Sequence, residues 1–96
     1  MSNQVKITVL KKTIQEDLFS YRQNPGDPPV ASCPHFEVGQ SFVCTTNNLP
    51  VGFCAWAFGD IAKDFALVAY DSTKTAIKIT CCTSGLHNVY FRIEAI

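Results

Sequence analysis

The chain has 96 residues, 47% of them hydrophobic and 17% charged, and its eight basic residues balance its eight acidic ones. This composition is typical of a folded domain and excludes a disordered chain, and the lack of a basic stripe argues against nucleic acid as a partner. We expect a single domain over residues 1–96 whose ligand site is shallow, or is shared between subunits of a homo-oligomer, because about 100 residues leave little room for an enclosed cavity beside a core.

The N-terminal half predicts two strands separated by a short helix and a loop. Apolar and polar residues alternate from residue 4 to about residue 11, which is typical of a half-buried strand. Thr13-Ile14-Gln15-Glu16 has the pattern of a capping box, so we expect a short helix to begin at about residue 14. The prolines of residues 25–29 end this helix, and residues 41–45 form the second predicted strand.

The main helix is predicted over residues 53–69, a stretch without proline. On a helical wheel one apolar face is expected to turn toward the core, and it consists of Cys54, Phe58, Ile61 and Phe65. An adjoining stripe of small residues suits the close approach of a sheet, and it consists of Ala55, Gly59, Ala62 and Ala66. Trp56 and Asp60 lie on the remaining, less apolar face.

The C-terminal residues predict an antiparallel hairpin. A strand is expected from about residue 75 to residue 82, and Ser84-Gly85 then turns the chain. In the last strand Val89, Phe91 and Ile93 are expected to point inward, alternating with polar residues. The predicted fold class is therefore α+β, a small and mostly antiparallel four-stranded sheet packed on one long and one short helix.

Five cysteines cannot all pair within one chain, and we recognise neither a signal peptide nor a membrane-spanning segment. We therefore expect reduced thiols in a cytoplasmic protein without a membrane partner. Cys44 and Cys81 are in phase with apolar neighbours and are predicted to pack. Cys54 is in phase with the core face but also stands near a helix N-terminus, where backbone N–H groups stabilise a thiolate, so it suits either packing or nucleophilic attack. Cys82 points away from Cys81 and is the freest to act.

A second group of residues suits proton transfer on a small organic molecule. Trp56 and Asp60 are one helical turn apart, so an indole wall stands beside a carboxylate. His87, in the connection after Gly85, suits an acid or a base because an unperturbed imidazole titrates near neutrality. The plainer alternatives are that Asp60 is a surface carboxylate and that His87 is a solvated loop residue. The alternative of a solvated histidine applies more strongly to His35.

We expect neither a metal nor a cofactor. The sequence contains no Cys-x-x-Cys motif and no spaced pair of histidines, so the patterns of zinc fingers and ribbons are missing. The remaining possibility is a site assembled from Cys33, Cys54 and either Cys81 or Cys82, with a histidine as the fourth ligand.

Three motifs together resemble a family of small uncharacterised prokaryotic proteins, and the resemblance covers nearly the whole chain. The motifs are Cys33-Pro34-x-Phe36-x-x-Gly39-x-x-Phe42, Gly52-Phe53-Cys54-x-Trp56-Ala57-x-x-Asp60-Ile61 and Cys81-Cys82-Thr83-x-Gly85-Leu86-x-x-Val89-x-Phe91. The resemblance implies an intracellular single-domain protein without an established activity.

This chain departs from the family pattern at a few positions. The pattern has an aspartate after Cys-Cys-Thr and an Arg-Pro pair after Gly-Leu, whereas this chain has Ser84, His87 and Asn88. If the charged residues of the family bind a ligand, the resemblance implies that this chain acts on a less charged molecule.

Three hypotheses follow from the sequence. The first is an isomerase, cyclase or lyase without a cofactor, whose catalytic residues are Asp60, His87, Cys54 and Cys82. Its ligand-binding residues are Trp56, Phe53, Cys33 and Ser84. The second is a thiolate metal-binding or redox-sensing module, and the third is a structural or interaction domain in which the cysteines only pack.

Overall fold

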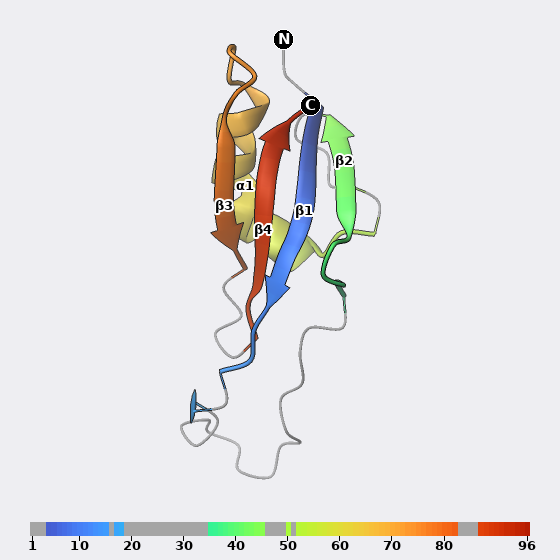
Figure 1. Ribbon diagram of the computed structural model, residues 1–96, viewed down its shortest axis with the longest axis vertical. Coiled ribbons are helices and arrows are strands. Elements are labelled where there is room, and N and C mark those ends of the chain that lie inside the picture. Colours follow the sequence, from blue (N-terminus) through green and yellow to red (C-terminus); the bar gives the residue numbers. More distant parts are fainter. Residues whose placement is uncertain (1–3, 16, 19–34, 46–49, 51, 83–86) are drawn as a thin grey trace.

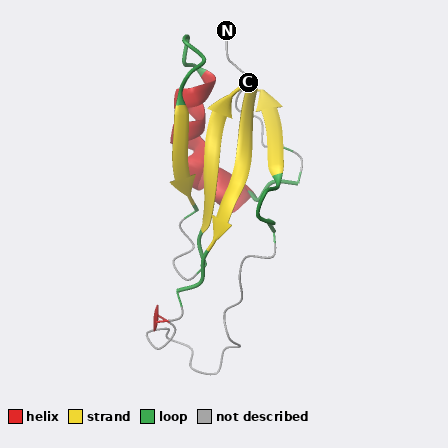
Figure 2. Cartoon of the chain, in the orientation of Figure 1, coloured by secondary structure: helices red, strands yellow, loops and turns green. Residues whose placement is uncertain are grey.

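The computed structural model describes residues 4–15, 17–18, 35–45, 50, 52–82 and 87–96. They form four strands and one long helix, which are β1 (Gln4–Lys12), β2 (Ser41–Thr45), α1 (Ala55–Ala69), β3 (Ile77–Cys81) and β4 (Val89–Ala95). The strands make one antiparallel sheet in the order β2-β1-β4-β3, and α1 packs across one face of it (Figure 1). Figure 2 shows the same two layers, and among the described residues no helix covers the other face of the sheet. The predicted α+β class and the antiparallel sheet are confirmed.

The two central strands, β1 and β4, set the register of the sheet. Ile7 of β1 is paired with Phe42 on one side and with Ile93 on the other, so apolar residues of three strands meet on the inner face. The β1–β4 register shifts between Val9 and Lys11, where a bulge accommodates one extra residue. Inward-pointing Val89, Phe91 and Ile93 are fully buried, as their alternation predicts.

The short helix expected from residue 14 lies mostly outside the described residues. Nearby, the described part of the chain has a turn of 3-10 helix at Asp17 and Leu18. Thr13 begins this segment, and the capping contact expected between it and residue 16 lies outside the described residues. Its backbone N–H and its hydroxyl donate to the carbonyl oxygen of Asn88 at 2.8 and 3.2 Å, so Thr13 ties the end of β1 to the start of β4.

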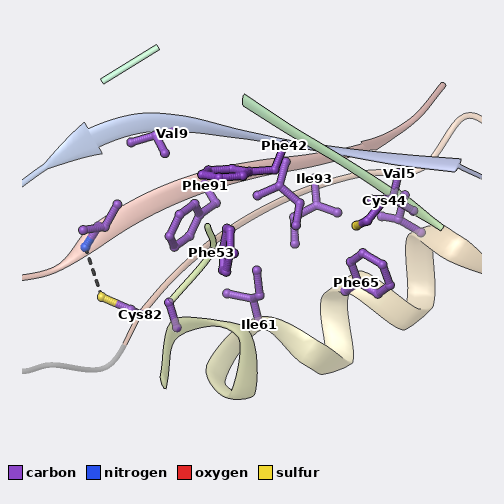
Figure 3. Packing of buried hydrophobic residues seen from close by; sticks show 14 of the residues in the cluster. Val5, Val9, Phe42, Cys44, Phe53, Ile61, Phe65, Cys82, Phe91 and Ile93 are labelled. Atoms are coloured by element: carbon purple, nitrogen blue, oxygen red, sulfur yellow. Dashed lines mark hydrogen bonds between the residues drawn. The ribbon is translucent and has the colours of Figure 1, made fainter. Parts of the chain in front are cut away.

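The core lies between the inner face of the sheet and α1, and phenylalanine rings fill much of it (Figure 3). The Phe53 ring lies 5.0 Å from that of Phe36, 5.0 Å from that of Phe42 and 5.4 Å from that of Phe91, measured between centroids. The contacts of Phe42 with Phe53 and of Phe36 with Phe42 and Phe91 are edge-to-face, an arrangement that adds to the free energy gained by burial. Phe53 is therefore a core residue.

The buried face of α1 is rotated from the predicted one. Ile61 and Phe65 are buried as expected, but the face is completed by Ala57, Val68 and Ala69, whereas Cys54 and Phe58 are half-buried. The predicted stripe of small residues does not meet the sheet. Its members Ala55, Gly59 and Ala62 are exposed, because the helix presents Ala57 to the sheet instead. The helical wheel cannot distinguish two neighbouring apolar faces, and the position of the sheet decides between them.

The outer face of the sheet also corrects the prediction for Cys81. Ile77 and Ile79 are 58% and 61% exposed, and the half-buried Cys81 shares their face. The alternation of β3 is as expected, but its apolar residues point away from α1. Cys81 therefore does not pack in the core, whereas Cys44 does. Within the described part of the chain, no helix has the length and apolarity needed to cross a bilayer.

Candidate functional site

A cleft of about 280 Å³ opens beside the N-terminal end of α1. Residues from four places in the chain line it. They come from the turn before β2, from the start of α1, from the residue after β3 and from the segment before β4. The described lining residues are His35, Phe36, Cys54, Trp56, Ala57, Cys82 and His87. Two imidazoles, two thiols and two aromatic walls therefore share one concave surface, which is the usual composition of a small-molecule site.

A glycine directs the chain into this end of α1. Gly52 has a φ of +81°, a left-handed conformation that suits glycine because it has no Cβ. The N–H of Phe53 donates to the carbonyl oxygen of Pro50 at 3.1 Å and closes the turn. Cys54 follows in an extended conformation as the N-cap residue of α1, and its side chain makes no capping hydrogen bond. The thiol of Cys54 lines the cleft instead of closing the helix end.

A lysine on β1 holds the opposite wall. The ammonium group of Lys12 donates to the carbonyl oxygen of Phe36 at 2.8 Å, a charge-assisted bond between segments 24 residues apart. The Phe36 ring is buried and packs against Phe53 and Phe91. Phe36 therefore joins the cleft to the aromatic core, while its exposed neighbour His35 lines the cleft.

The hydrogen bonds between Cys82 and Val89 are unusual for an antiparallel pair. The N–H of Cys82 donates to the carbonyl oxygen of Val89 at 3.0 Å, but the N–H of Val89 donates to Cys82 Sγ at 3.2 Å (Figure 3). The carbonyl oxygen of Cys82 accepts from Nδ2 of Asn88 at 3.1 Å. An antiparallel hydrogen-bonded pair ordinarily exchanges two N–H···O bonds. Here the side-chain amide of Asn88 donates to the carbonyl oxygen of Cys82 in place of the Val89 N–H, which donates to the sulfur instead.

The network continues beyond Asn88. Its carbonyl oxygen accepts from Thr13, and its side-chain Oδ1 is buried without a hydrogen-bond partner among the described residues. The Nδ2 bond to Cys82 therefore fixes the amide. Thr13, Asn88 and Cys82 thus link β1 to the rim of the cleft through a chain of hydrogen bonds.

The structure brings together four of the eight predicted site residues, namely Cys54, Trp56, Cys82 and His87. Trp56 is 71% exposed and stands at the cleft as a wall rather than as part of the core. Asp60 and Phe53 are not among the described lining residues; Asp60 is half-buried on α1, and Phe53 lies in the core. Cys33 and Ser84 lie outside the described residues.

Sequence reasoning missed three lining residues, which are His35, Phe36 and Ala57. His35 was interpreted as a solvated turn residue because a lone histidine in a loop is usually one. The signal that could have found it is its neighbour Phe36, since a buried aromatic residue after proline anchors the turn and thereby positions His35.

The described lining of the cleft consists of two histidines, two cysteines and three apolar residues. Its described lining residues include no Asp, Glu, Lys or Arg. Among the described histidines, cysteines and carboxylates, no group of three or more is arranged to hold a metal ion. Burial raises the pKa of the Cys44 thiol because it disfavours the thiolate, and Cys44 does not line the cleft.

Comparison with known proteins adds no relative. The chain matches no family model, and neither a curated protein nor a solved structure is significantly similar to it. The resemblance to the family of small uncharacterised prokaryotic proteins therefore stays a prediction from the three motifs.

Proposed function

We propose that the protein binds a small, uncharged, unsaturated or aromatic molecule in the cleft and moves a proton on it, as an isomerase, cyclase or lyase without a cofactor. The observation that carries the proposal is the meeting of His35, His87 and Trp56 around one cleft of about 280 Å³. That size suits a metabolite-sized ligand, and an imidazole can either accept or donate a proton.

The roles in this proposal differ from those expected from the sequence at one position. Asp60 does not line the cleft, so His35 takes the place of the carboxylate as the partner of His87. One imidazole removes a proton from the ligand, and the other returns a proton at a second atom. Trp56, which is exposed, provides a flat apolar surface that orients the ligand.

The lack of carboxylate, ammonium and guanidinium groups among the described lining residues supports an uncharged ligand. A carboxylate or phosphate entering the cleft would lose hydration, and no ammonium or guanidinium group among the described lining residues compensates for that loss. An amide or ketone of the same shape loses far less. We therefore expect the cleft to discriminate against anions by charge rather than by size.

Benzamide and benzoate test this expectation because they have nearly the same shape and differ in charge. We expect benzamide to bind at least ten times more tightly at pH 7.5, observed by NMR through the indole N–H of Trp56 and the imidazole protons of His87. Trp56→Ala should weaken the binding of benzamide. Leu67→Ala, at another exposed position of α1, is the matched control and should leave it unchanged. Equal binding of both probes would contradict the proposal.

A test of catalysis applies to any small uncharged compound that the protein is found to convert. His87→Ala should lower turnover by roughly 10²-fold, the usual contribution of a positioned proton-transfer group. The rate should also depend on pH near neutrality. Asp60→Asn is the control, because Asp60 does not line the cleft, and it should retain most of the activity. The opposite order of effects would return the catalytic role to Asp60.

A second candidate function is supported by the two thiols of the same cleft. Cys54 and Cys82 both line it, as a thiol-based redox sensor would require. Hydrogen peroxide would oxidise one thiol to a sulfenic acid, and the other thiol would then displace water to form a disulfide. Intact-protein mass spectrometry after peroxide treatment should show the loss of two hydrogen atoms in the wild type and not in Cys54→Ser.

A further inference from the structure

The environment of Cys82 differs from that of an ordinary packed cysteine. Its Sγ accepts the N–H of Val89, a donor that would otherwise complete the ladder between β3 and β4, while Asn88 satisfies the carbonyl oxygen of Cys82. Cys82 is only 6% exposed, yet it lines the cleft with two imidazoles and a second thiol. Access to Cys82 is therefore through the cleft.

A backbone N–H aimed at sulfur has more effect on a thiolate than on a thiol. A neutral thiol is a weak hydrogen-bond acceptor, so the Val89 N–H gains little from it. A hydrogen bond whose acceptor carries a charge is roughly twice as strong as a neutral one. The hydrogen bond from the Val89 N–H thus stabilises the Cys82 sulfur most when the sulfur carries negative charge, as a nucleophile does at the moment of attack.

We propose that Cys82 is a nucleophile that adds to the electron-poor double bond of a small conjugated carbonyl compound bound in the cleft. This inference rests on the proposed function for the place of the ligand, and it adds a covalent step. The class of ligand follows from the site: the compound is uncharged because the described lining has no Asp, Glu, Lys or Arg, planar to lie against the exposed indole of Trp56, and electrophilic toward a soft sulfur.

The step balances without an oxidant, a reductant or a leaving group. An imidazole of the cleft takes the thiol proton, and the sulfur lone pair forms a C–S bond to the β-carbon. The π pair of the C=C bond moves onto the carbonyl system as an enolate, and the imidazolium returns the proton to the α-carbon. In reverse, the thiolate is expelled and the double bond is restored. Rotation about the intervening single bond gives the other geometric isomer.

The chain contains its own reference thiols. Cys44 is 9% exposed and therefore as buried as Cys82, but burial raises its pKa and it does not line the cleft. Cys81 is the next residue along the chain and is half-buried on the outer face. If burial or position alone governed reactivity, Cys82 would behave like Cys44, and Cys81 would react faster than either.

The experiment uses N-methylmaleimide, a small uncharged conjugated carbonyl compound, at substoichiometric concentration with the full chain at pH 7. Tryptic digestion and fragmentation of the peptide that contains both Cys81 and Cys82 identify the alkylated residue. We expect Cys82 to react at least ten times faster than Cys44 and faster than Cys81 and Cys54. First alkylation at Cys54 or Cys81, or equal rates at Cys82 and Cys44, would overturn the inference.

N-methylsuccinimide separates this inference from the proposed function, because it has the shape of the maleimide without the reactive double bond. At millimolar excess it should slow alkylation of Cys82 and leave that of Cys81 unchanged. If N-methylsuccinimide slows the alkylation of Cys82 but Cys82 reacts slowly even without it, the result would contradict the nucleophilic role of Cys82 and still support the ligand cleft. Fast reaction without protection would support the nucleophile and contradict the ligand cleft. Cys82→Ser must abolish the fast phase, and Cys44→Ser must retain it.

Discussion

The two ends of the inner sheet face contain equally buried cysteines with different surroundings. At the packed end, Cys44 is paired with Val5 and lies on the same side of the core as Phe65 (Figure 3). At the cleft end, Cys82 accepts a backbone hydrogen bond and lines an open space with Trp56. Their exposed fractions, 9% and 6%, do not distinguish them.

The comparison shows that burial by itself does not separate a structural thiol from a candidate functional one. Apolar surroundings raise the pKa of Cys44 because they disfavour its charged form. Cys82 has the Val89 N–H as a partner and access to a ligand through the cleft. What a buried sulfur can do therefore depends on its hydrogen-bond donors and on the adjoining space.

The largest effect should come from removing the ring at the packed end. Phe65→Ala deletes a fully buried side chain and should lower the free energy of unfolding by about 3–5 kcal/mol, through lost transfer energy and a new cavity. Trp56→Ala removes a larger but exposed ring at the cleft end and should cost less than about 1 kcal/mol. Urea denaturation measures both. A similar loss in the two variants would show that the cleft end is packed like the rest of the core.

An intermediate effect should separate the two cysteines themselves. Cys44→Ser places a hydroxyl among apolar side chains and should cost about 1–3 kcal/mol, the usual penalty for an unsatisfied buried polar group. In Cys82→Ser the new oxygen inherits the Val89 N–H as a donor, so roughly half of that cost or less is expected. Thermal unfolding of the two variants at pH 7 gives the comparison. If the order is reversed, the hydrogen bond at Cys82 does not offset the burial of a polar atom.

The smallest effect is expected from the turn between α1 and β3. The hydroxyl of Thr73, followed by the N–H of Ala76 and other backbone donors, lowers the pKa of the Asp71 carboxyl below its ordinary value. The folded state therefore favours the carboxylate, so its contribution to stability is present above the ordinary pKa and is lost as pH falls through the lowered one. Between about pH 5 and pH 2, Asp71→Asn should show a weaker decline of Tm than the wild type. An identical decline would remove Asp71 as a source of acid sensitivity.

The strands and the long helix could be predicted from the sequence because their signals are local. Alternation places Val89, Phe91 and Ile93 on one side of β4 whatever surrounds them, since successive side chains of a strand point to opposite faces. The stretch without proline over residues 53–69 likewise allows a helix to continue. Local periodicity therefore determined the α+β class and the antiparallel hairpin.

The assignment of faces and of the site depended on the tertiary structure, because it needs contacts between distant segments. Alternation in β3 does not say which face meets α1, so the prediction that Cys81 packs was wrong, and Cys81 lies with the exposed Ile79 on the outer face. His35 lines the cleft beside Phe36, whose ring is anchored against Phe42 of β2, Phe91 of β4 and Phe53 before α1. The sequence by itself determined which residues alternate and which can react. Only the packing of α1 on the sheet decided that Cys54 and Cys82 share a cleft with His87, because that proximity depends on the path of the whole chain.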